Sequence, residues 1–285
     1  MVGNAGQAEF WDDRAPAWDE LAERMETATG EHSRAARVAL ALQPGERVLD
    51  LGCGAGLTAV ALGREVGDDG WVGAVDVSSV MAAAAGRRMA EAGINGVAVA
   101  ADVQIDDLIA VTGADTAYDA AHSRFGVMFF EDPLAAFANI AAALRPDGRF
   151  AASVWRDLSA NPFMAVPTMV ALDPLGVTDL PLPEPGAPGP FSMADPDATR
   201  SLLEDAGFVD VGVEAVDTPV AVVGEGEPWA VQALRVGPLA AAYESADPGA
   251  QRATVAAVLT AMEAFRTGSG YEIGAGSWTI TARVP

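Results

Sequence analysis

The sequence predicts an α/β fold in which a parallel sheet carries helices on both faces. From residue 44 to residue 155, apolar runs alternate with helix-compatible stretches, which is the pattern of consecutive strand–helix–strand units. The first run, Val48–Leu51, contains Asp50 and leads into glycines at positions 52, 54 and 56. Alternating glycines after a buried strand let the backbone turn sharply and approach a ligand closely. The sequence therefore predicts a nucleotide-like cofactor site at this turn.

Residues 1–43 are predicted to form a helical cap before the first strand. Apolar and aromatic side chains recur there at spacings of three and four; they are Phe10, Trp11, Ala15, Trp18, Leu21, Ala22 and Met25. We expect His32, in the same segment, on the surface or on a helix face, and a pocket-lining role is the alternative.

The spacing of the glycines indicates the kind of cofactor. Dinucleotide sites use G-x-G-x-x-G, whereas here the third glycine comes one residue early and Asp50 precedes the first glycine by two. Both departures disfavour a nicotinamide dinucleotide. Cys53, the single cysteine, is expected to be a small apolar filler under the loop, which we favour over a catalytic thiol.

Two further strands are also expected to end in acidic residues. After a helix over Leu57–Val66, the run Trp71–Val75 ends in Asp76, and the run Val97–Ala101 ends in Asp102. A carboxylate at the end of the second strand can accept hydrogen bonds from both hydroxyls of an adenosine ribose. Each acid alone could be a turn or helix-capping residue, but three successive strand-end acids predict one site.

A fourth run, Tyr118–Phe125, and a fifth, Ala151–Trp155, complete the alternating region. In an open α/β sheet, ligands bind beyond the carboxyl ends of the strands where the strand order reverses, here between the first and fourth strands. His122, Ser123 and Arg124 are expected at this point.

Beyond Trp155 the pattern changes. We expect helices over Asn161–Leu175, Trp229–Tyr243 and Ala250–Thr267, a surface loop over Leu180–Phe191, and strands over Val209–Pro219 and Ser277–Val284.

These segments together resemble class I S-adenosylmethionine-dependent methyltransferases. The run DLGCGAG at residues 50–56 is similar to their first motif, LRPDGRF at 144–150 to their turn into the fifth strand, and AGF at 206–208 to their turn into the sixth. The resemblance covers most of the chain and is nearest to the ubiquinone- and menaquinone-biosynthesis-like branch, which includes many small-molecule methyltransferases of bacterial secondary metabolism. It implies a Rossmann-like, seven-stranded, mostly parallel sheet whose last strand is an antiparallel edge.

The resemblance divides the chain into a helical N-terminal cap, residues 1–43, and a methyltransferase domain, residues 44–285. The domain carries insertions at about 156–195 and 225–270, and the helical one before the last strand is too long for a plain connection. We expect this insertion to be a lid over the acceptor pocket or a dimer interface.

The resemblance also implies which residues bind S-adenosylmethionine and its product S-adenosylhomocysteine. Asp76 would hold the ribose, Asp102 and Val103 would hold the adenine with Asp102 accepting from its exocyclic amine, and an aromatic residue near Trp18 would close over the cofactor. Simple anchoring of the helix is the alternative for Trp18. The full expected set is Trp18, Asp50, Gly52, Gly54, Gly56, Asp76, Val77, Met81, Asp102, Val103 and Ser123.

Methyl transfer from a sulfonium is an in-line displacement, so the protein mainly aligns the reactants in a dry pocket. His122 is the candidate general base for an acceptor that loses a proton, and a structural histidine is the alternative. Arg124 is expected to pair with a neighbouring acid rather than with an acceptor carboxylate. Apolar side chains downstream of the switch point suit a small, aromatic or hydrophobic acceptor, and packing in the core is the alternative for most of them; they are Phe125, Met128, Phe129, Phe130, Trp155, Phe163 and Met164.

The composition disfavours some classes of binding partner. The net charge is −23, and all 17 basic residues are arginine, so nucleic acid and anionic membranes are disfavoured as partners. The polar N-terminal segment and the absence of a long apolar run predict a cytoplasmic protein. We expect no metal site, although Asp119, Glu131 and Asp132 could hold magnesium, and a homodimer is one expected assembly.

Two rival functions stay open on the sequence. A NAD(P)-dependent oxidoreductase would need the longer glycine spacing. A protein that binds S-adenosylmethionine without transferring its methyl group would keep all three strand-end acids. Oxygen, nitrogen and carbon acceptors are not distinguished by these residues.

Overall fold

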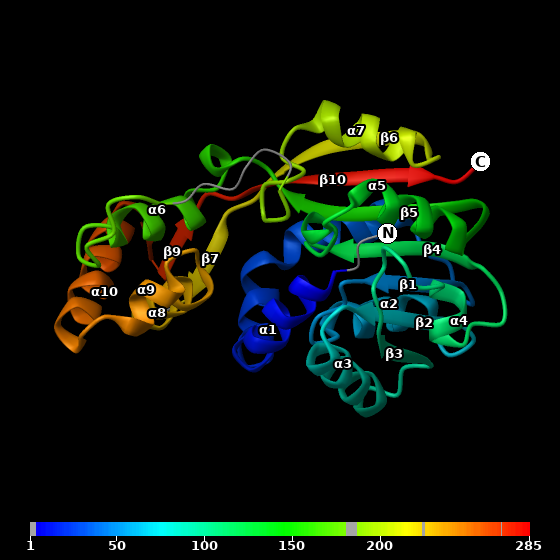
Figure 1. The fold of residues 1–285 in the computed structure, drawn as a ribbon, viewed down its shortest axis with the longest axis horizontal. Helices are drawn as coiled ribbons and strands as arrows, with labels where there is room; N and C mark the ends of the chain where they lie inside the picture. Colours follow the sequence, from blue (N-terminus) through cyan, green and yellow to red (C-terminus); the bar gives the residue numbers. More distant parts are fainter. Residues whose placement is uncertain (1–3, 181–186, 224–225, 269) are drawn as a thin grey trace. The chain divides into compact units, whose positions relative to one another are not determined.

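The computed structural model describes residues 4–180, 187–223, 226–268 and 270–285. Its main element is a seven-stranded sheet in the order β3-β2-β1-β4-β5-β10-β6 (Figure 1). The strands are β1 (Arg47–Leu51), β2 (Trp71–Asp76), β3 (Gly96–Ala100), β4 (Tyr118–Arg124), β5 (Leu144–Trp155), β6 (Val209–Asp217) and β10 (Gly276–Arg283). Strands β1 to β5 pair in parallel, so the predicted seven-stranded, mostly parallel sheet is confirmed.

The last strand lies inside the sheet, which corrects the expectation of an edge. Strand β10 pairs antiparallel with β5 from Ser277–Trp155 to Arg283–Arg149, and β6 is the edge strand on its other side. Side chains of β10 are buried on both faces, as Ile280 and Thr279 show, whereas most of β6 is exposed or half-buried. The antiparallel direction was predicted correctly and the position was not.

Helices cover both faces of this sheet. One face carries α1 (Ala5–Leu40), α2 (Leu57–Val66) and α3 (Ser79–Glu91), whose apolar side chains form one cluster with Val48, Val72 and Ala151 of the strands. Ala151 follows Phe150 in β5, so these two side chains point to opposite faces. Phe150 contacts Phe137 of α5 (Pro133–Ala143) on the other face, where α4 (Leu108–Thr112) and α7 (Pro196–Asp205) also pack.

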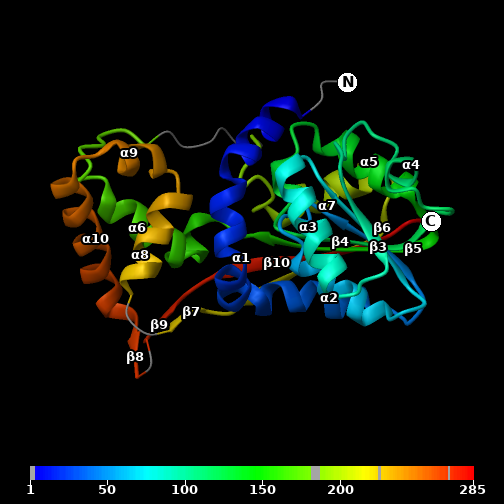
Figure 2. The same ribbon diagram turned by 90° about the horizontal axis from the view of Figure 1, so that it is seen from below.

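The N-terminal cap is a single long helix. Helix α1 contacts α3 and strands β4 and β5, and Figure 2 shows it running past α3. It ends where Ala41 adopts a left-handed conformation with φ of +51°, and Pro16 lies within it. The helix expected within residues 1–43 is therefore confirmed, and it lies along the sheet.

The chain divides into two compact units. The first comprises residues 1–155, 185–216 and 277–285 and contains the large sheet. The second comprises residues 156–184 and 217–276 and contains helices α6 (Pro162–Ala171), α8 (Glu227–Val236), α9 (Ala240–Ser245) and α10 (Pro248–Met262). The lid and interface roles expected for the insertions stay predictions.

The second unit also has a small sheet that the sequence analysis missed. Its order is β7-β9-β8, from β7 (Val220–Val223), β9 (Gly270–Ile273) and β8 (Arg266–Thr267). These strands are too short to show an alternation of apolar and polar residues. The residues of β8 were expected at the end of the helix over Ala250–Thr267. The expected helix over Trp229–Tyr243 is broken between α8 and α9, where Gly237-Pro238 cannot continue a helix.

Part of the expected loop over Leu180–Phe191, residues 181–186, lies outside the described residues. Within the described ranges, no helix combines the length and the apolar character that crossing a bilayer requires. The expected cytoplasmic location, the homodimer and the exclusion of nucleic acid stay predictions.

Candidate functional site

The carboxyl ends of β1, β2 and β4 meet around the loop that joins β1 to α2. This loop contains Gly52, Gly54 and Gly56, with φ angles of +63°, +51° and +87°. A Cβ at Gly56 would lie 2.6 Å from the Cα of Ala85 in α3, whereas a Cβ at Gly54 would meet no atom of the described residues within 4 Å. Gly56 thus permits close packing of the loop on α3, and the Gly54 backbone is open to a ligand.

Asp76 binds the glycine loop to the end of β2. Its Oδ2 accepts from the Gly54 N–H at 2.8 Å and its Oδ1 from the Ser78 N–H at 2.9 Å. The side chain is 8% exposed, and burial raises its pKa to about 6 although the two N–H groups oppose the rise. The ribose-binding candidate is therefore a buried carboxyl group that also fixes the loop.

Cys53 lies beneath the same loop. It is buried in the apolar cluster formed by α1, α2, α3 and the strands, and burial raises the pKa of its thiol well above the usual value. A neutral, enclosed thiol is a poor nucleophile. The interpretation of Cys53 as an apolar filler is thus confirmed.

Asp50 and His122 form a buried pair at the switch point. They occupy paired positions on β1 and β4, are 1% and 0% exposed, and approach to 3.5 Å between Asp50 Oδ1 and His122 Nδ1. Neither carboxylate oxygen and neither ring nitrogen has a hydrogen-bond partner among the described residues. A buried carboxylate requires a donor or a counter-ion, so either an N–H donor from His122 or a cationic ligand group suits Asp50.

Asp102 is bonded to the start of α1. Its Oδ2 accepts from the Asn4 N–H at 2.7 Å, and its Oδ1 accepts from the Asn4 side-chain Nδ2 at 3.1 Å and from the Gln104 N–H at 3.0 Å. The sequence analysis did not single out Asn4, since no local pattern relates it to a residue 98 positions away.

Three acidic residues of α1, spaced seven residues apart, attach the helix to the rim of the site. Asp12 accepts from the Ser78 hydroxyl at 2.6 Å, Asp19 pairs with Arg88 at 3.0 Å, and Glu26 pairs with Arg124. The Ser78 hydroxyl lowers the pKa of Asp12. The expectation that Arg124 pairs with an acid is confirmed, and the spacing of seven was the signal by which these acids could have been found.

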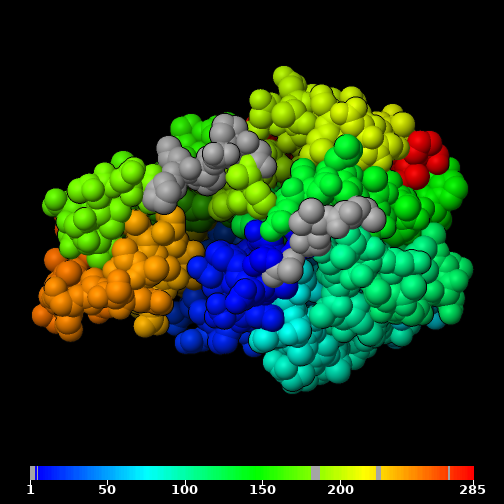
Figure 3. Space-filling model, in the orientation of Figure 1, coloured from blue at the N-terminus to red at the C-terminus, as the bar shows by residue number. Residues whose placement is uncertain are grey.

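Aromatic side chains of α1 lie against the same rim. Trp18 packs on a cluster that includes Ala55 of the loop and Met81 of α3, and it meets Trp11 edge to face at 5.9 Å. Trp11 in turn meets Phe129 at 5.0 Å. In Figure 3, α1 and α3 are neighbours at the surface. Trp18 and Met81 are therefore beside the loop, a position that fits both a cofactor-binding role and simple anchoring of the helix.

Phe125 and Trp155 form an aromatic stack beyond the end of β4. Their rings are 4.0 Å apart and nearly parallel at 9°, and Phe125 has a left-handed φ of +57°. A non-glycine residue in this conformation is strained and often lies at a functional site. His32 meets Trp155 edge to face at 5.3 Å and shares a 2.7 Å hydrogen bond with the Ser277 hydroxyl, so His32 is buried and the expected surface position is wrong.

The other expected residues have different surroundings. The buried Ser123 hydroxyl donates to the Leu51 carbonyl at 2.8 Å and so joins β4 to β1. Val77 is half-buried directly after Asp76, and Val103 is buried directly after Asp102. The apolar residues Phe163 and Met164 belong to the second unit.

Within the ranges that the structure describes, no group of three or more histidine, cysteine or acidic residues could hold a metal ion. Asp119 pairs with Arg145 at 2.6 Å near the start of β4, away from the strand end, and Asp132 caps α5. Asp119 and Asp132, which were considered as magnesium ligands, therefore serve in an ion pair and in a helix cap at different places.

Comparison with known proteins identifies a methyltransferase domain in this chain. Residues 48–148 match the family described as "Methyltransferase domain". Nocamycin O-methyltransferase of Saccharothrix syringae is 28% identical over 180 residues, which are 59% of this chain and 61% of that protein. The 2-phytyl-1,4-naphtoquinone methyltransferase of Synechococcus elongatus is 31% identical over 145 residues, 50% of this chain and 60% of that protein.

The chain thus spans about three fifths of the length of these curated relatives. Among solved structures, the YcgJ protein of Bacillus subtilis is similar with a TM-score of 0.54 and 16% identity, covering 89% of this chain and 98% of that chain. At this identity the similarity shows a shared fold.

The two glycines give a matched pair of variants. Gly54→Ala should lower the free energy of unfolding by about 1–2 kcal/mol, the cost of a side chain in a left-handed conformation. Gly56→Ala should lower it further because its Cβ also meets the α3 backbone at 2.6 Å. Chemical unfolding of both variants checks this order, and equal losses would contradict the packing role of Gly56.

The raised pKa of Asp76 has a measurable consequence. Between the usual value of 3.8 and about 6, the folded state holds a proton that the unfolded state has lost, so the free energy of unfolding falls as pH rises through this window and is level above it. A rise of this size corresponds to roughly 3 kcal/mol. Carbon-13 NMR of the aspartate carboxyls, with Asp76→Asn to assign the signal, should give a midpoint near 6, and a midpoint near 4 would refute it.

Proposed function

Because residues 48–148 match a methyltransferase-domain family, we propose that the chain is a class I S-adenosylmethionine-dependent methyltransferase that transfers a methyl group from this cofactor to a small, aromatic or hydrophobic metabolite. The observation that carries the proposal is the gathering of the strand-end carboxylates Asp50 and Asp76 around a glycine loop whose backbone is open at Gly54. Asp102 follows the end of the neighbouring strand β3.

The names of the relatives support the acceptor class. One is named for nocamycin and the other for 2-phytyl-1,4-naphtoquinone, and both names specify a small organic compound. The half-buried Phe125, stacked on the buried Trp155 beside the end of β4, offers a flat apolar ring that such a compound would contact. We propose an acceptor of the secondary-metabolite type on this basis.

The residues at the loop fit the cofactor. Asp76 keeps lone pairs beyond its two backbone contacts, so it can also accept from ribose hydroxyls. Asp50 has two buried oxygens without a hydrogen-bond partner among the described residues, which suits a cationic group. When bound, S-adenosylmethionine supplies a methyl group activated by a positively charged sulfur.

The protein's own residues would align the reactants and exclude water. Trp18 packs against Ala55 and Met81, and this apolar contact borders the loop on the α1 side. The displacement disperses charge rather than creating it, so alignment in a dry site is the main contribution. We propose His122 as the base for an acceptor that loses a proton: its Nδ1 faces Asp50, which leaves Nε2 to take the proton.

The cofactor assignment is tested by removing one carboxylate. Asp76→Ala should weaken S-adenosylhomocysteine binding by about 30- to 150-fold, the effect of two charge-assisted hydrogen bonds worth about 2–3 kcal/mol. Asp119→Ala, at the start of β4, is the control and should bind normally. Calorimetry gives both affinities, and unchanged binding in folded Asp76→Ala, or preference for NADH, would refute the assignment.

The role of His122 is tested by separating rate from affinity. His122→Asn and His122→Ala should slow single-turnover methylation of phenol, enol or naphthoquinol acceptors by about 10²- to 10⁴-fold, while S-adenosylmethionine affinity stays within a few-fold. A structural histidine would instead lower stability and affinity together. Unchanged single-turnover rates in both variants would remove the base role.

A further inference from the structure

The first turn of α1 occupies the position that the proposed function gives to the adenine amine. The Asn4 side-chain Nδ2 and backbone N–H donate to the two carboxylate oxygens of Asp102 at 3.1 and 2.7 Å. The Asn4 side-chain oxygen accepts from the Glu131 N–H at 3.3 Å, and the residue is only 5% exposed. The carboxamide of Asn4 is therefore held on both its donor and acceptor sides.

Asn4 makes these contacts instead of capping its helix. It is the N-cap residue of α1, and asparagine is favoured there because its oxygen can accept from first-turn N–H groups. The Asn4 side chain makes no such bond. Gly6 weakens the same turn by about 1 kcal/mol relative to alanine. The first turn of α1 is thus stabilised mainly by its contacts with Asp102 and Glu131.

We propose that this first turn competes with the adenine of S-adenosylmethionine for Asp102. The inference rests on the proposed function, in which Asp102 accepts from the exocyclic amine of adenine. A carboxamide and that amine are both planar N–H₂ donors. With Asn4 and Gln104 bound, Asp102 already accepts three hydrogen bonds of the roughly four that a carboxylate can take. In this proposal Asn4 leaves before adenine binds, because the amine would take the place of the Asn4 carboxamide N–H at Asp102.

The rest of α1 stays attached during this exchange. Asp12, Asp19 and Glu26 hold the helix at Ser78, Arg88 and Arg124, all beyond the first turn. Only the first turn, which contains Asn4, must be released. The measured cofactor affinity is then lowered by the fraction of molecules in which Asp102 is occupied by Asn4.

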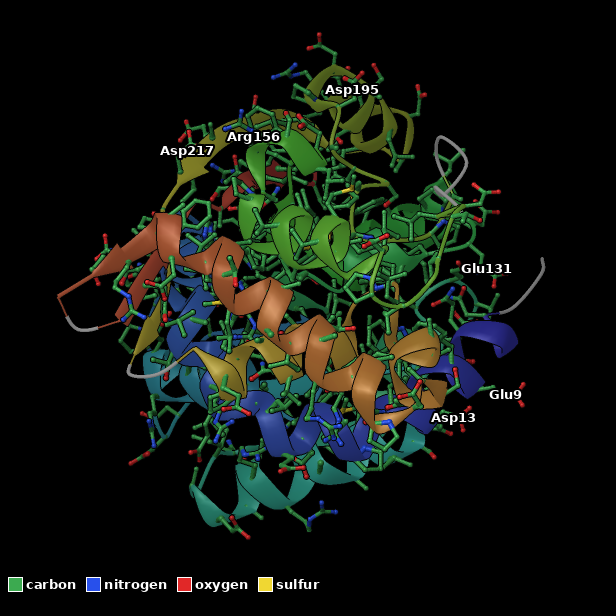
Figure 4. The ribbon with its side chains drawn as sticks, turned by 90° about the vertical axis from the view of Figure 1, so that its left-hand side faces the viewer. Glu9, Asp13, Glu131, Arg156, Asp195 and Asp217 are labelled. Carbon is green, nitrogen blue, oxygen red and sulfur yellow. The ribbon has the colours of Figure 1, made fainter. Side chains whose placement is uncertain are left out.

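Variants at two positions of the turn should shift this competition in opposite directions. Asn4→Ala removes the mimic of the amine, and Asn4→Asp repels Asp102, so both should tighten S-adenosylhomocysteine binding by about 5- to 10-fold. Gly6→Ala strengthens the helical turn and should weaken binding by about 3-fold; its Cβ would be 3.6 Å from the Glu131 side chain, an ordinary contact. Glu9→Ala is the control, because Glu9 is exposed and points away from the protein (Figure 4).

Calorimetry with S-adenosylhomocysteine and hydrogen exchange of the full chain test the competition between Asn4 and adenine for Asp102. The proposal expects the affinity order above and faster amide exchange in the first turn of α1 when the ligand is bound. Slower exchange there, or Asn4 variants that bind no tighter, would overturn the competition. If the competition is overturned in this way but Asp102→Asn binds S-adenosylhomocysteine more weakly than the wild type, the proposed function still holds. If neither the wild type nor the Asn4 variants bind the ligand, the proposed function fails and the competition fails with it.

Discussion

The hydrogen bond from the Gly54 amide to the buried Asp76 carboxylate joins the end of β1 to the end of β2. It fixes a loop whose φ angles only glycine adopts readily, and the second oxygen of Asp76 fixes the Ser78 amide at the start of α3. Gly56 then packs on Ala85 of that helix. One carboxylate thereby sets the positions of the loop, of α3 and of the surface on which α1 lies.

Burying carboxylates at this edge of the sheet is unfavourable unless basic groups lie beside them. Burial raises the pKa values of Asp76 and Cys53, and the negative charge of Asp50 adds to both rises. His122 is the basic group placed beside Asp50, while Arg88 and Arg124 on the rim meet acids of α1.

The sequence was sufficient for features that depend on neighbours in the chain. The glycine loop, the ends of β1 and β2 and the helix over Leu57–Val66 are local patterns, and they were predicted closely. The position of β10 inside the sheet depends on pairing with β5 more than a hundred residues earlier, and no local signal encodes it. The contact between Asn4 and Asp102 has the same origin, whereas the seven-residue spacing of Asp12, Asp19 and Glu26 was visible and was overlooked.

Because Cys53 is enclosed under the glycine loop, chemical modification of its thiol can report opening of that loop. Cys53 is the single thiol of the chain, it is 6% exposed, and its raised pKa keeps it protonated at neutral pH. An alkylating reagent can therefore modify the chain at one place and only in molecules whose glycine loop has moved aside. The rate of that single modification, followed by mass, would count these rare openings without any engineered label.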